Sequence, residues 1–377
     1  MIRDRTAQEA RLLAAKRLVE DVLIPAEAEM DQTDEVPAPV LAAIREAGLF
    51  GISIPDSFGG LGLTMEEEAE LMLVLGHSAP AYRSRYALNS GGAAQILLHA
   101  GSEAQQARWL PSMASGEIVA AFCLSEQEAG SDAASLRSEA RPDGSGGWVL
   151  QGSKRWVTNA PEAGLFLVMA RTGDAISAFA VPAGVPGLTV LPTQRKMGLR
   201  GMHVADLRFD GVRLPGDALV GPAGAGLRSA LAGLDKVRLH LAALCAGLSE
   251  RMISDGVHHA AQRQQFGRPL HEHQMVAAML ADSATEALAA RCMALELARK
   301  RDEGRLAPGE AAAAKLFATE ALGRVADRML QLHGGEGYME GSAIERLYRD
   351  ARLFRILDGT SEVQRIVVSR WAIHAQG

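Results

Sequence analysis

The chain has 377 residues, of which 48% are hydrophobic and 22% charged, so it has the balance of a globular protein with a sizeable core and the length of two or three domains or one large one. Lys and Arg number 39 against 45 Asp and Glu, and the net charge of -6, with both signs mixed along the chain, excludes the clustered positive charge of a nucleic-acid-binding protein. The cysteines Cys123, Cys245 and Cys292 are far apart and build neither a disulfide framework nor a thiolate metal site.

Neither a targeting signal nor a membrane span is predicted. The first residues, Met1 to Arg5, are charged and lack the apolar run of a signal peptide. No stretch reaches the roughly 20 continuous apolar residues that a membrane span requires. We therefore expect a soluble, cytoplasmic protein of bacterial type.

The first third of the chain is predicted to form a helical domain over residues 1–118. Apolar residues recur every three to four positions from Leu12 to Leu23, which places them on one buried helix face. A short helix is predicted over Val40–Ala47, where Gly48 stops it. Two capping boxes predict the starts of further helices: Thr64 with Glu67, and Ser102 with Gln105.

The pattern changes near Glu117, and residues 119–230 are predicted to form a β domain. Short apolar runs such as Val119–Leu124 and Phe166–Ala170 are separated by Gly, Pro and Asp turns, which is typical of antiparallel strands. No helical pattern of ten residues comes between the runs, so a parallel doubly wound sheet is not expected. The prediction is an antiparallel barrel or sandwich.

After Gly226 the helical period returns, which predicts a C-terminal helical bundle over residues 231–377. Thr360 or Ser361 is expected to cap its last helix. The predicted fold class is α+β and mostly α, with a helical domain, a β domain and a helical bundle in that order. The long helices are expected at Leu231–Ala260, at His273–Arg301, and at Pro308–Leu332 with a stop at Gly334 and Gly335.

Several common kinds of site are not favoured. The Gly-rich segment 221–226 lacks the βαβ context and final Gly of a dinucleotide-binding loop, so we interpret it as a linker. The pairs His258–His259 and His271–His273 lack the spacing of a metal site, and no metal is expected. The sequence contains neither a Gly-x-Ser-x-Gly elbow nor a Cys in electropositive surroundings, so nucleophilic hydrolysis is not favoured.

Four segments carry residues suited to chemistry, and each also has a plain structural interpretation. Residues 122–132 run off a strand into a loop of hydroxyls and glycine. Trp156 and Thr158 would share one face of a strand, which suits a flavin or base ring, although a core Trp of a sandwich fits equally well. Taken alone, the turn at 331–337 is a helix C-cap, and Asp358 is more typical of a helix start than of a catalytic base.

The order and spacing of these segments, across nearly the whole chain, resemble the acyl-CoA dehydrogenase family of flavoproteins. Any one segment is a weak pattern, but eight of them in the right order leave little room for chance. The architecture of that family is a helical domain, a barrel-like β domain and a C-terminal four-helix bundle, which agrees with the predicted elements. The further matching segments are 55–63, 197–201, 207–215, 235–238 and 262–270.

The resemblance implies that FAD is held in an extended form between subunits, without a Rossmann loop. Because such sites are shared, it also implies a homotetramer, built as a dimer of dimers. The flavin would be contacted by Phe122, Leu124, Ser125, Gly130 and Ser131, with Trp156 and Thr158 across its ring and Thr360 and Glu362 nearby. The pyrophosphate and adenine of a neighbouring subunit's FAD would be reached by Arg263, Gln265, Phe266, Gln274, Gln331 and Gly335.

The resemblance also implies the reaction. Asp358 would remove the α-proton of an acyl-CoA thioester, and the β-hydrogen would leave as hydride to flavin N5, which gives a trans-2-enoyl-CoA. The thioester carbonyl would be held by the backbone N–H of the base residue and a ribityl hydroxyl. An electron-transferring flavoprotein would take the electrons. Substrate contacts would come from Ser131, Asp235, Arg238 and Gly359.

This chain departs from the pattern of the family at positions near the chemistry. Most members carry Glu where Asp358 stands, and others place the base on the helix after the β domain, where Val237 cannot serve. Asp358 is thus the only base that the resemblance offers. Gln127 and Glu128 replace a usual Pro-Gly and add a negative charge, and Met202 replaces a small hydroxyl residue. These changes bear on substrate identity more than on FAD binding.

Two alternatives to a dehydrogenase stay open. A flavin oxidase on the same scaffold is the first, because nitroalkane oxidase resembles this family and uses an Asp at the position corresponding to Asp358. Asp235 and Arg238, which match thioester contacts, favour the dehydrogenase. The second is a non-catalytic flavin scaffold akin to nucleic-acid-associated relatives, against which the net charge argues.

Overall fold

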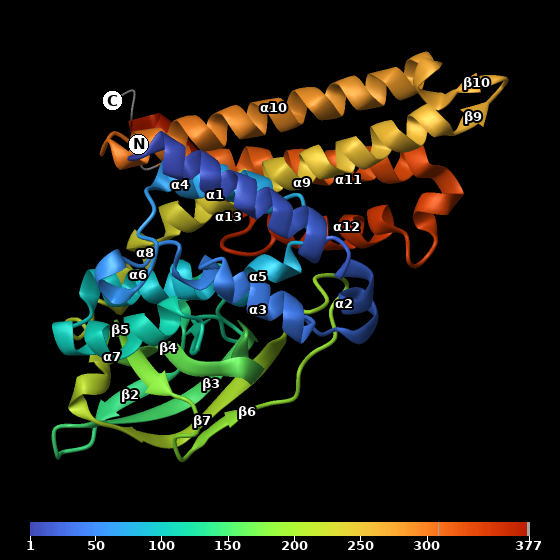
Figure 1. Ribbon diagram of the computed structural model, residues 1–377. Helices are drawn as coiled ribbons and strands as arrows, with labels where there is room; N and C mark the ends of the chain where they lie inside the picture. Colours follow the sequence, from blue (N-terminus) through green and yellow to red (C-terminus); the bar gives the residue numbers. More distant parts are fainter. Residues whose placement is uncertain (308, 375–377) are drawn as a thin grey trace.

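Helices, a β-sheet and then long helices follow one another along the chain in the computed structural model, which describes residues 1–307 and 309–374 (Figure 1). The N-terminal helices are α1 (Arg5–Leu18), α2 (Glu27–Thr33), α3 (Ala38–Glu46), α4 (Met65–Leu75), α5 (Ala81–Ser90), α6 (Gly92–Ala100) and α7 (Glu103–Ala114). The strands of the sheet are β1 (Val119–Cys123), β2 (Glu139–Pro142), β3 (Trp148–Thr158), β4 (Ala163–Thr172), β5 (Ala175–Pro182), β6 (Leu188–Val190), β7 (Val204–Leu214) and β8 (Leu219–Val220). The C-terminal elements are α8 (Gly226–Ala232), α9 (Leu234–Gln262), the hairpin strands β9 (Gln264–Gln265) and β10 (Arg268–Pro269), α10 (Gln274–Asp302), α11 (Glu310–Tyr338), α12 (Ala343–Ala351) and α13 (Ser361–His374).

Both predicted capping boxes are confirmed. At the start of α4, the Thr64 hydroxyl accepts a hydrogen bond from the backbone of Glu67, whose carboxylate accepts one from the backbone of Thr64. Ser102 and Gln105 make the same reciprocal pair at the start of α7. Each box satisfies two N–H groups that a helix start leaves without intrahelical partners.

The fold class is confirmed, and the sheet of the β domain is mixed and open rather than wholly antiparallel or closed. Its strands follow the order β6-β7-β3-β2-β4-β5-β8, with β1 added at β4. Most neighbours are antiparallel, but β1 runs parallel to β4, with Ala120 opposite Leu165. Both of these strands are almost continuously buried, which is the environment that parallel pairing requires.

The sheet is covered by helices on one face. In Figure 1 the helices α5, α6 and α7 lie between the sheet and the long helices of the bundle. Ile96, Leu110 and Met113 of this layer pack against Leu165 and Leu167 of β4 in one buried cluster. The same layer includes α5, whose Ser84 carbonyl accepts a hydrogen bond from Asn159 at the end of β3.

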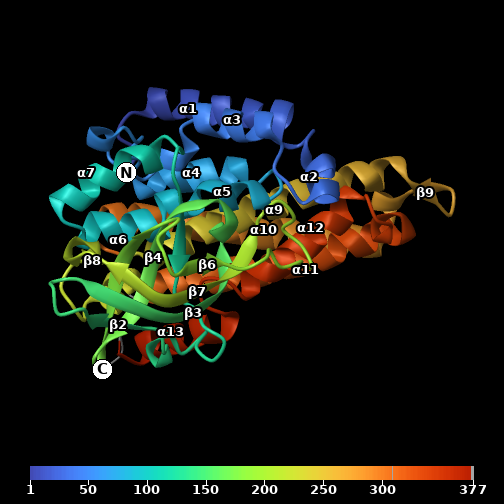
Figure 2. The ribbon, with the colours of Figure 1, turned by 90° about the horizontal axis from the view of Figure 1, so that it is seen from below.

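Three long helices, α9, α10 and α11, pack together as the bundle, and α4 of the N-terminal segment packs against α9 and α10 (Figures 1 and 2). α9 and α10 match the prediction to within three residues at each end, and α11 is broken at Gly334, close to its predicted end. Pro308, the predicted start of that helix, lies outside the described residues. None of the helices within 1–307 and 309–374 is long and apolar enough to cross a bilayer.

The predicted stop of α11 at Gly334 coincides with a break in the helix. Gly334 adopts φ 62° and ψ -142°, after which the helical backbone resumes as far as Tyr338. A glycine reaches this conformation without the steric cost of a Cβ, so one helical segment ends there and a short second segment follows.

Candidate active site

The loop after β1 is fastened to β3 by backbone and side-chain hydrogen bonds. The backbone N–H of Arg155 donates to the carbonyl of Ser125 at 2.9 Å. The Lys154 ammonium, fully buried, donates to the carbonyl of Leu124 at 3.1 Å and to the Glu126 carboxylate at 2.6 Å. The predicted flavin contacts Leu124 and Ser125 therefore sit on a loop whose path is fixed by β3, and Phe122 precedes them on β1.

Glu126 organises the other end of this loop. Its carboxylate accepts hydrogen bonds from the backbone N–H groups of Arg137 and Ser138 at 2.6 and 3.0 Å. Burial raises the pKa of Glu126, but Lys154 and the backbone donors outweigh it and hold the pKa below its usual range. The negative charge of Glu128 is paired with the Arg137 guanidinium, with 2.6 Å between the two groups. The replacement at position 128 therefore adds no unpaired charge beside the loop.

Trp156 projects from the sheet at a β-bulge. The pairing of β3 with β7 slips between Lys154 and Val157, and Trp156 takes φ 54° while its backbone N–H donates to Asp206 at 2.9 Å. The indole is 56% exposed and the Arg155 guanidinium lies 4.5 Å from the ring centroid. A bulge re-aims a side chain, and here it presents a flat aromatic surface to open space.

Thr158 ends the same strand, half-buried, while Val157 between the two points into the core. Among the described residues its hydroxyl makes no hydrogen bond, and neither does that of Ser131 on the exposed part of the loop. The side-chain amide of Asn159, the residue after Thr158, donates to the carbonyl of Ser84 on α5 at 2.8 Å. The strand end is thus joined to α5, and the shared face of Thr158 and the Trp156 indole stays a prediction.

Asp358 lies on a tight turn between α12 and α13. Asp358 and Gly359 have φ 51° and 90°, two consecutive left-handed residues. The carbonyl of Gly359 accepts hydrogen bonds from the Lys315 ammonium at 2.8 Å and from the Gln364 amide at 2.9 Å. Thr360 caps α13 by accepting a hydrogen bond from the backbone of Val363. The left-handed backbone conformation of Asp358 is unfavourable in free energy, and these hydrogen bonds stabilise it. The turn therefore gives the Asp358 side chain a defined starting direction.

The Asp358 carboxylate is reached by solvent, but protein surrounds it closely. It makes no hydrogen bond or ion pair with any described residue. Loss of water raises its pKa, and the positive charges of Arg83, Lys315 and Arg238 act in the opposite direction. Asp358 is therefore a carboxylate of increased basicity with three cations near it and no fixed partner.

Asp235 and Arg238 lie on the first turns of α9 and pair with each other, with 2.8 Å between Oδ1 and Nη1. The Nε atom of Arg238 is buried without a hydrogen-bond partner among the described residues. Glu362 is fully exposed on the first turn of α13. Gly130 has no atom within 4 Å of the position that a Cβ would take, so the backbone there is open to close approach.

The remaining predicted cofactor residues lie far from Asp358. Lys315, which touches the Asp358 turn, and Gln331 are 16 residues apart on α11, about 24 Å at 1.5 Å per residue. The hairpin β9–β10 lies at the end of the bundle where α9 gives way to α10 (Figure 1). Phe266 at its tip is 95% exposed. This distal group is exposed throughout: Arg263, Gln265, Phe266, Gln274, Gln331 and Gly335.

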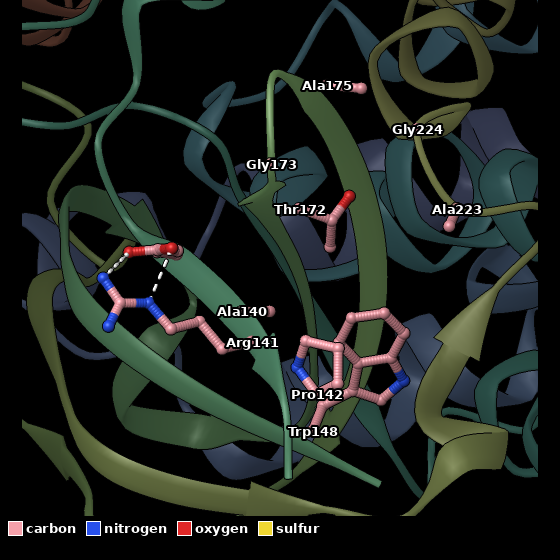
Figure 3. A pocket seen from close by; sticks show the side chains of 10 residues that line it. Ala140, Arg141, Pro142, Trp148, Thr172, Gly173, Ala175, Ala223 and Gly224 are labelled. Atoms are coloured by element: carbon pink, nitrogen blue, oxygen red, sulfur yellow. Dashed lines mark hydrogen bonds and ion pairs between the residues drawn. The ribbon is translucent and has the colours of Figure 1, made fainter. Parts of the chain in front are cut away.

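One recess elsewhere carries none of these residues. It has a volume of about 500 Å³ and lies at the end of β2, beside Trp148, Thr172 and Gly224 (Figure 3). Arg141 at its rim is paired with Glu139. Within the part of the chain that the structure describes, no group of three metal-ligating side chains comes together. The recess therefore offers no chemistry to rival that of the Asp358 region.

Arg83, Lys315 and Lys154 were not identified from the sequence. Lys315 and Lys154 had a detectable signal, because each interrupts a buried pattern: Lys315 stands among the buried alanines of α11, and Lys154 points inward on β3. A charged residue on a buried face requires a partner. Arg83 had no such signal, because its proximity to Asp358 arises only when α5 meets the C-terminal segment.

An exposed indole on a bulge, a loop held by hydrogen bonds and a carboxylate near three cations are compatible with a flavoprotein oxidoreductase. Three family models match the chain: the acyl-CoA dehydrogenase N-terminal domain over residues 6–117, the middle domain over 121–212 and the C-terminal domain over 224–373. The chain belongs to the acyl-CoA dehydrogenase family and is an oxidoreductase, which confirms the resemblance.

Individual proteins show the same similarity. The acyl-CoA dehydrogenase of Bacillus subtilis (strain 168) is 35% identical over 356 residues, which cover 93% of this chain and 94% of that one. The structure of butyryl-CoA dehydrogenase from Megasphaera elsdenii superposes with a TM-score of 0.94 at 29% identity, over 99% of this chain and 100% of that one. A chain in a structure described as the electron transferring flavoprotein of Acidaminococcus fermentans gives 0.93 at 31% identity, over 98% and 99%.

Proposed function

We propose that this protein dehydrogenates an acyl-CoA thioester to the trans-2-enoyl-CoA, with Asp358 as the base that removes the α-proton. The observation that carries the proposal is the state of Asp358: a carboxylate without a fixed partner among residues 1–307 and 309–374, on a turn fastened by Lys315 and Gln364. A structural carboxylate in such surroundings would be paired, whereas a base must keep its lone pairs free.

The residues around Trp156 fit a flavin. The indole offers a flat surface, the Ser131 and Thr158 hydroxyls are free to hydrogen bond, and the open backbone at Gly130 permits close approach. These groups, with Phe122, Leu124 and Ser125, would hold the isoalloxazine ring, and Thr360 and Glu362 would lie near it. When bound, FAD supplies the acceptor for the β-hydrogen, which leaves the substrate as hydride.

Asp358 has the proton affinity that this step needs. The α-proton of a thioester is weakly acidic, so the base gains from a pKa above that of an ordinary carboxylate. Burial raises the pKa of Asp358, while Arg83, Lys315 and Arg238 keep the ionised form accessible. The same cations stabilise the negative charge that develops on the substrate as the proton leaves.

The backbone of Asp358 is free to hold the thioester carbonyl. Among the described residues, no carbonyl or side chain accepts a hydrogen bond from the Asp358 N–H, although its neighbours Ile356 and Leu357 both donate to Leu353. A free N–H beside the base is placed to donate to the oxygen on which charge develops. Gly359, Ser131, Asp235 and Arg238 complete the substrate contacts in this proposal.

Partner and assembly follow from the same family membership. One structural neighbour comes from work on an electron transferring flavoprotein, and we propose such a protein as the electron acceptor. The exposed distal group, with Phe266 at its tip, is suited to a neighbouring subunit's FAD, and we propose a homotetramer. An exposed aromatic side chain beside basic residues such as Arg263 is suited to an interface that holds a charged cofactor.

The test is anaerobic reduction of the bound flavin by acyl-CoA thioesters, measured as the loss of the flavin's visible absorbance. Asp358→Asn should retain FAD and lose reduction by about four orders of magnitude or more, since an amide cannot take the proton. Asp174→Asn, the same change in the exposed turn after β4, should reduce normally. Undiminished reduction by Asp358→Asn would overturn the assignment, and rapid oxygen consumption during turnover would favour the oxidase.

A further inference from the structure

His203 joins the start of β7 to the end of β3. Its backbone carbonyl accepts a hydrogen bond from the N–H of Asn159 at 2.9 Å, and the neighbouring residues Val204 and Thr158 face each other in the strand ladder. The residue is buried, with 8% of it exposed. His203 is therefore bonded directly to the end of the strand that carries Trp156 and Thr158, which are proposed to lie against the flavin.

Both ring nitrogens of His203 face oxygen atoms that accept hydrogen bonds and donate none. Nδ1 is in close contact with the Glu162 carboxylate, and Nε2 lies 2.7 Å from the backbone carbonyl oxygen of Asp34. Burial raises the pKa of Glu162, but His203 and Arg85, the latter 3.0 Å from the same oxygen, hold the pKa below its usual range, so the carboxylate is ionised. A neutral imidazole has a single N–H and would turn a lone pair toward one of these oxygens. The ring in this position therefore carries both protons.

The ring of His203 ties together three parts of the chain. Glu162 follows β3 in the β domain, Asp34 ends α2 in a left-handed conformation with φ 57°, and Arg85 belongs to α5. The Asp34 carboxylate also accepts a hydrogen bond from the backbone N–H of Gly201 at 2.7 Å. The start of β7, and with it the end of β3, is thus held against α2 and α5 by contacts made by His203 or beside it.

The charges around the ring favour the imidazolium. The hydrogen bond to Glu162 is the largest influence on His203 and raises its pKa, burial lowers it, and the Asp34 carbonyl and the charge of Glu35 raise it again. The Glu35 carboxylate is largely exposed and lies 3.6 Å from Nε2. The pKa of His203 is therefore above the ordinary value of 6.5, and the ring loses its second proton in weakly alkaline solution.

Two other titratable groups belong to the surroundings of the segment that leads into β7. Burial lowers the pKa of Lys196, whose Nζ atom is buried without a hydrogen-bond partner among the described residues. Asp350 of α12 accepts a hydrogen bond from the backbone N–H of Leu199, and burial raises its pKa to about 7. Asp350 thus titrates close to the range of His203, so a variant of Asp350 is needed beside those of His203.

We propose that the doubly protonated ring of His203 positions the flavin-binding end of β3, so that the protein holds FAD more tightly at about pH 6 than at about pH 9. The inference rests on the proposed function in one respect, that the flavin lies against Trp156 and Thr158. When the ring loses a proton, one of its two hydrogen bonds is replaced by two facing lone pairs, and either Glu162 or Asp34 loses its donor. His203 is a positioning residue, because it acts through the strand and not by contact with the cofactor.

The experiment dilutes the holoenzyme into buffers from about pH 6 to about pH 9 and measures the FAD that passes an ultrafiltration membrane. The dissociation constant of FAD should rise by about 3- to 10-fold across this range, the effect of one hydrogen bond. The midpoint of the rise should lie above pH 6.5, the ordinary value for histidine.

Two variants test whether the rise belongs to His203. Glu162→Gln removes the charge that retains the proton, so the midpoint should move to lower pH. A purely structural loss would instead weaken FAD binding by the same factor at every pH. His203→Gln keeps one N–H donor but cannot titrate, so it should bind FAD with the weaker affinity throughout and show no transition.

His77→Gln is the matched control, because His77 is also paired with a carboxylate, that of Glu250 on α9, at 3.3 Å. Asp350→Asn removes the other group that titrates near this range. Both variants should keep the transition. Its loss in Asp350→Asn would assign the transition to Asp350 and overturn the inference.

Failure of the inference can be told apart from failure of the proposed function. A dissociation constant that does not change with pH in the natural protein, or an unmoved midpoint in Glu162→Gln, would overturn the role of His203 and leave the reduction of the flavin by thioesters intact. A holoenzyme whose flavin no thioester reduces would overturn the proposed function, and the release of FAD would still decide the inference.

Discussion

The Lys315 ammonium donates a hydrogen bond of 2.8 Å to the carbonyl oxygen of Gly359, which ties α11 to the turn that carries Asp358. The same ammonium is one of the cations that oppose the raised pKa of Asp358. One side chain therefore helps to hold the position of the proposed base and, with Arg83 and Arg238, opposes the rise of its pKa. The two effects can be separated, because Gln364 donates to the same carbonyl without carrying a charge.

We predict that Lys315→Met lowers the rate of flavin reduction by on the order of 10- to 100-fold, since a misplaced base reacts poorly. Because Lys315 lowers the pKa of Asp358, its removal raises that pKa, and the pH at which reduction reaches half its maximum moves upward. The measurement is the pH profile of anaerobic reduction.

Gln364→Met is the control for this prediction. It removes a neutral donor to Gly359, so the rate should fall while the pH profile stays in place. An unchanged profile in Lys315→Met would show that the lysine acts on the shape of the turn alone.

The second prediction concerns the pair formed by Lys154 and Glu126, which lie 2.6 Å apart and fasten the flavin loop. Lys154→Met leaves a buried carboxylate without its cation, which costs about 3–5 kcal/mol of stability. We expect a lower melting temperature and FAD that separates from the protein on desalting, measured by the absorbance that remains.

The double variant Lys154→Met/Glu126→Gln distinguishes loop position from overall stability. Without the buried charge, much of the stability should return. The backbone of Leu124 still lacks its donor, so FAD retention should stay low. Full recovery of FAD binding in the double variant would contradict the proposed role of the pair in positioning the loop.

Much of this architecture was predictable because its determinants are local. The capping boxes at Thr64 and Ser102 depend on residues three positions apart, and each formed as predicted. The parallel pairing of β1 with β4 was not predictable, because apolar runs specify burial and not strand direction. The approach of Arg83 to Asp358 depends on how α5 packs against the C-terminal segment, which no local pattern encodes. The break at Gly334 was predicted from the glycine pair, but the short helical segment that follows it, as far as Tyr338, was not.

The third prediction tests the proposed assembly at the hairpin tip. Phe266, 95% exposed, lies edge-on to His273 with 5.9 Å between ring centroids. If a neighbouring subunit covers it, Phe266→Ser should shift the particle from a tetramer to smaller species in light scattering and weaken FAD binding. Leu13→Ser, an apolar-to-polar change on the exposed side of α1, should do neither. A natural protein that is monomeric with its FAD bound would contradict the proposal.

The fourth prediction concerns stability and Asp350, a buried carboxyl of α12 that accepts a hydrogen bond from the backbone N–H of Leu199. Burial raises its pKa from 3.8 to about 7. The folded chain therefore binds more protons than the unfolded chain between these values, so this residue's contribution to stability falls as the pH rises from about 4 to about 7.

Asp350→Asn imitates the protonated form and keeps an oxygen that can accept the hydrogen bond from Leu199. The variant should be more stable than the natural protein at pH 8, by at most roughly 4 kcal/mol, and the difference should shrink to nearly nothing at pH 4. Urea unfolding at both pH values measures this difference. A difference that is constant with pH, or a natural protein that is the more stable one at pH 8, would show that Asp350 is ionised and stabilising in the folded chain, held by Arg349 and Arg346, whose charges oppose the effect of burial.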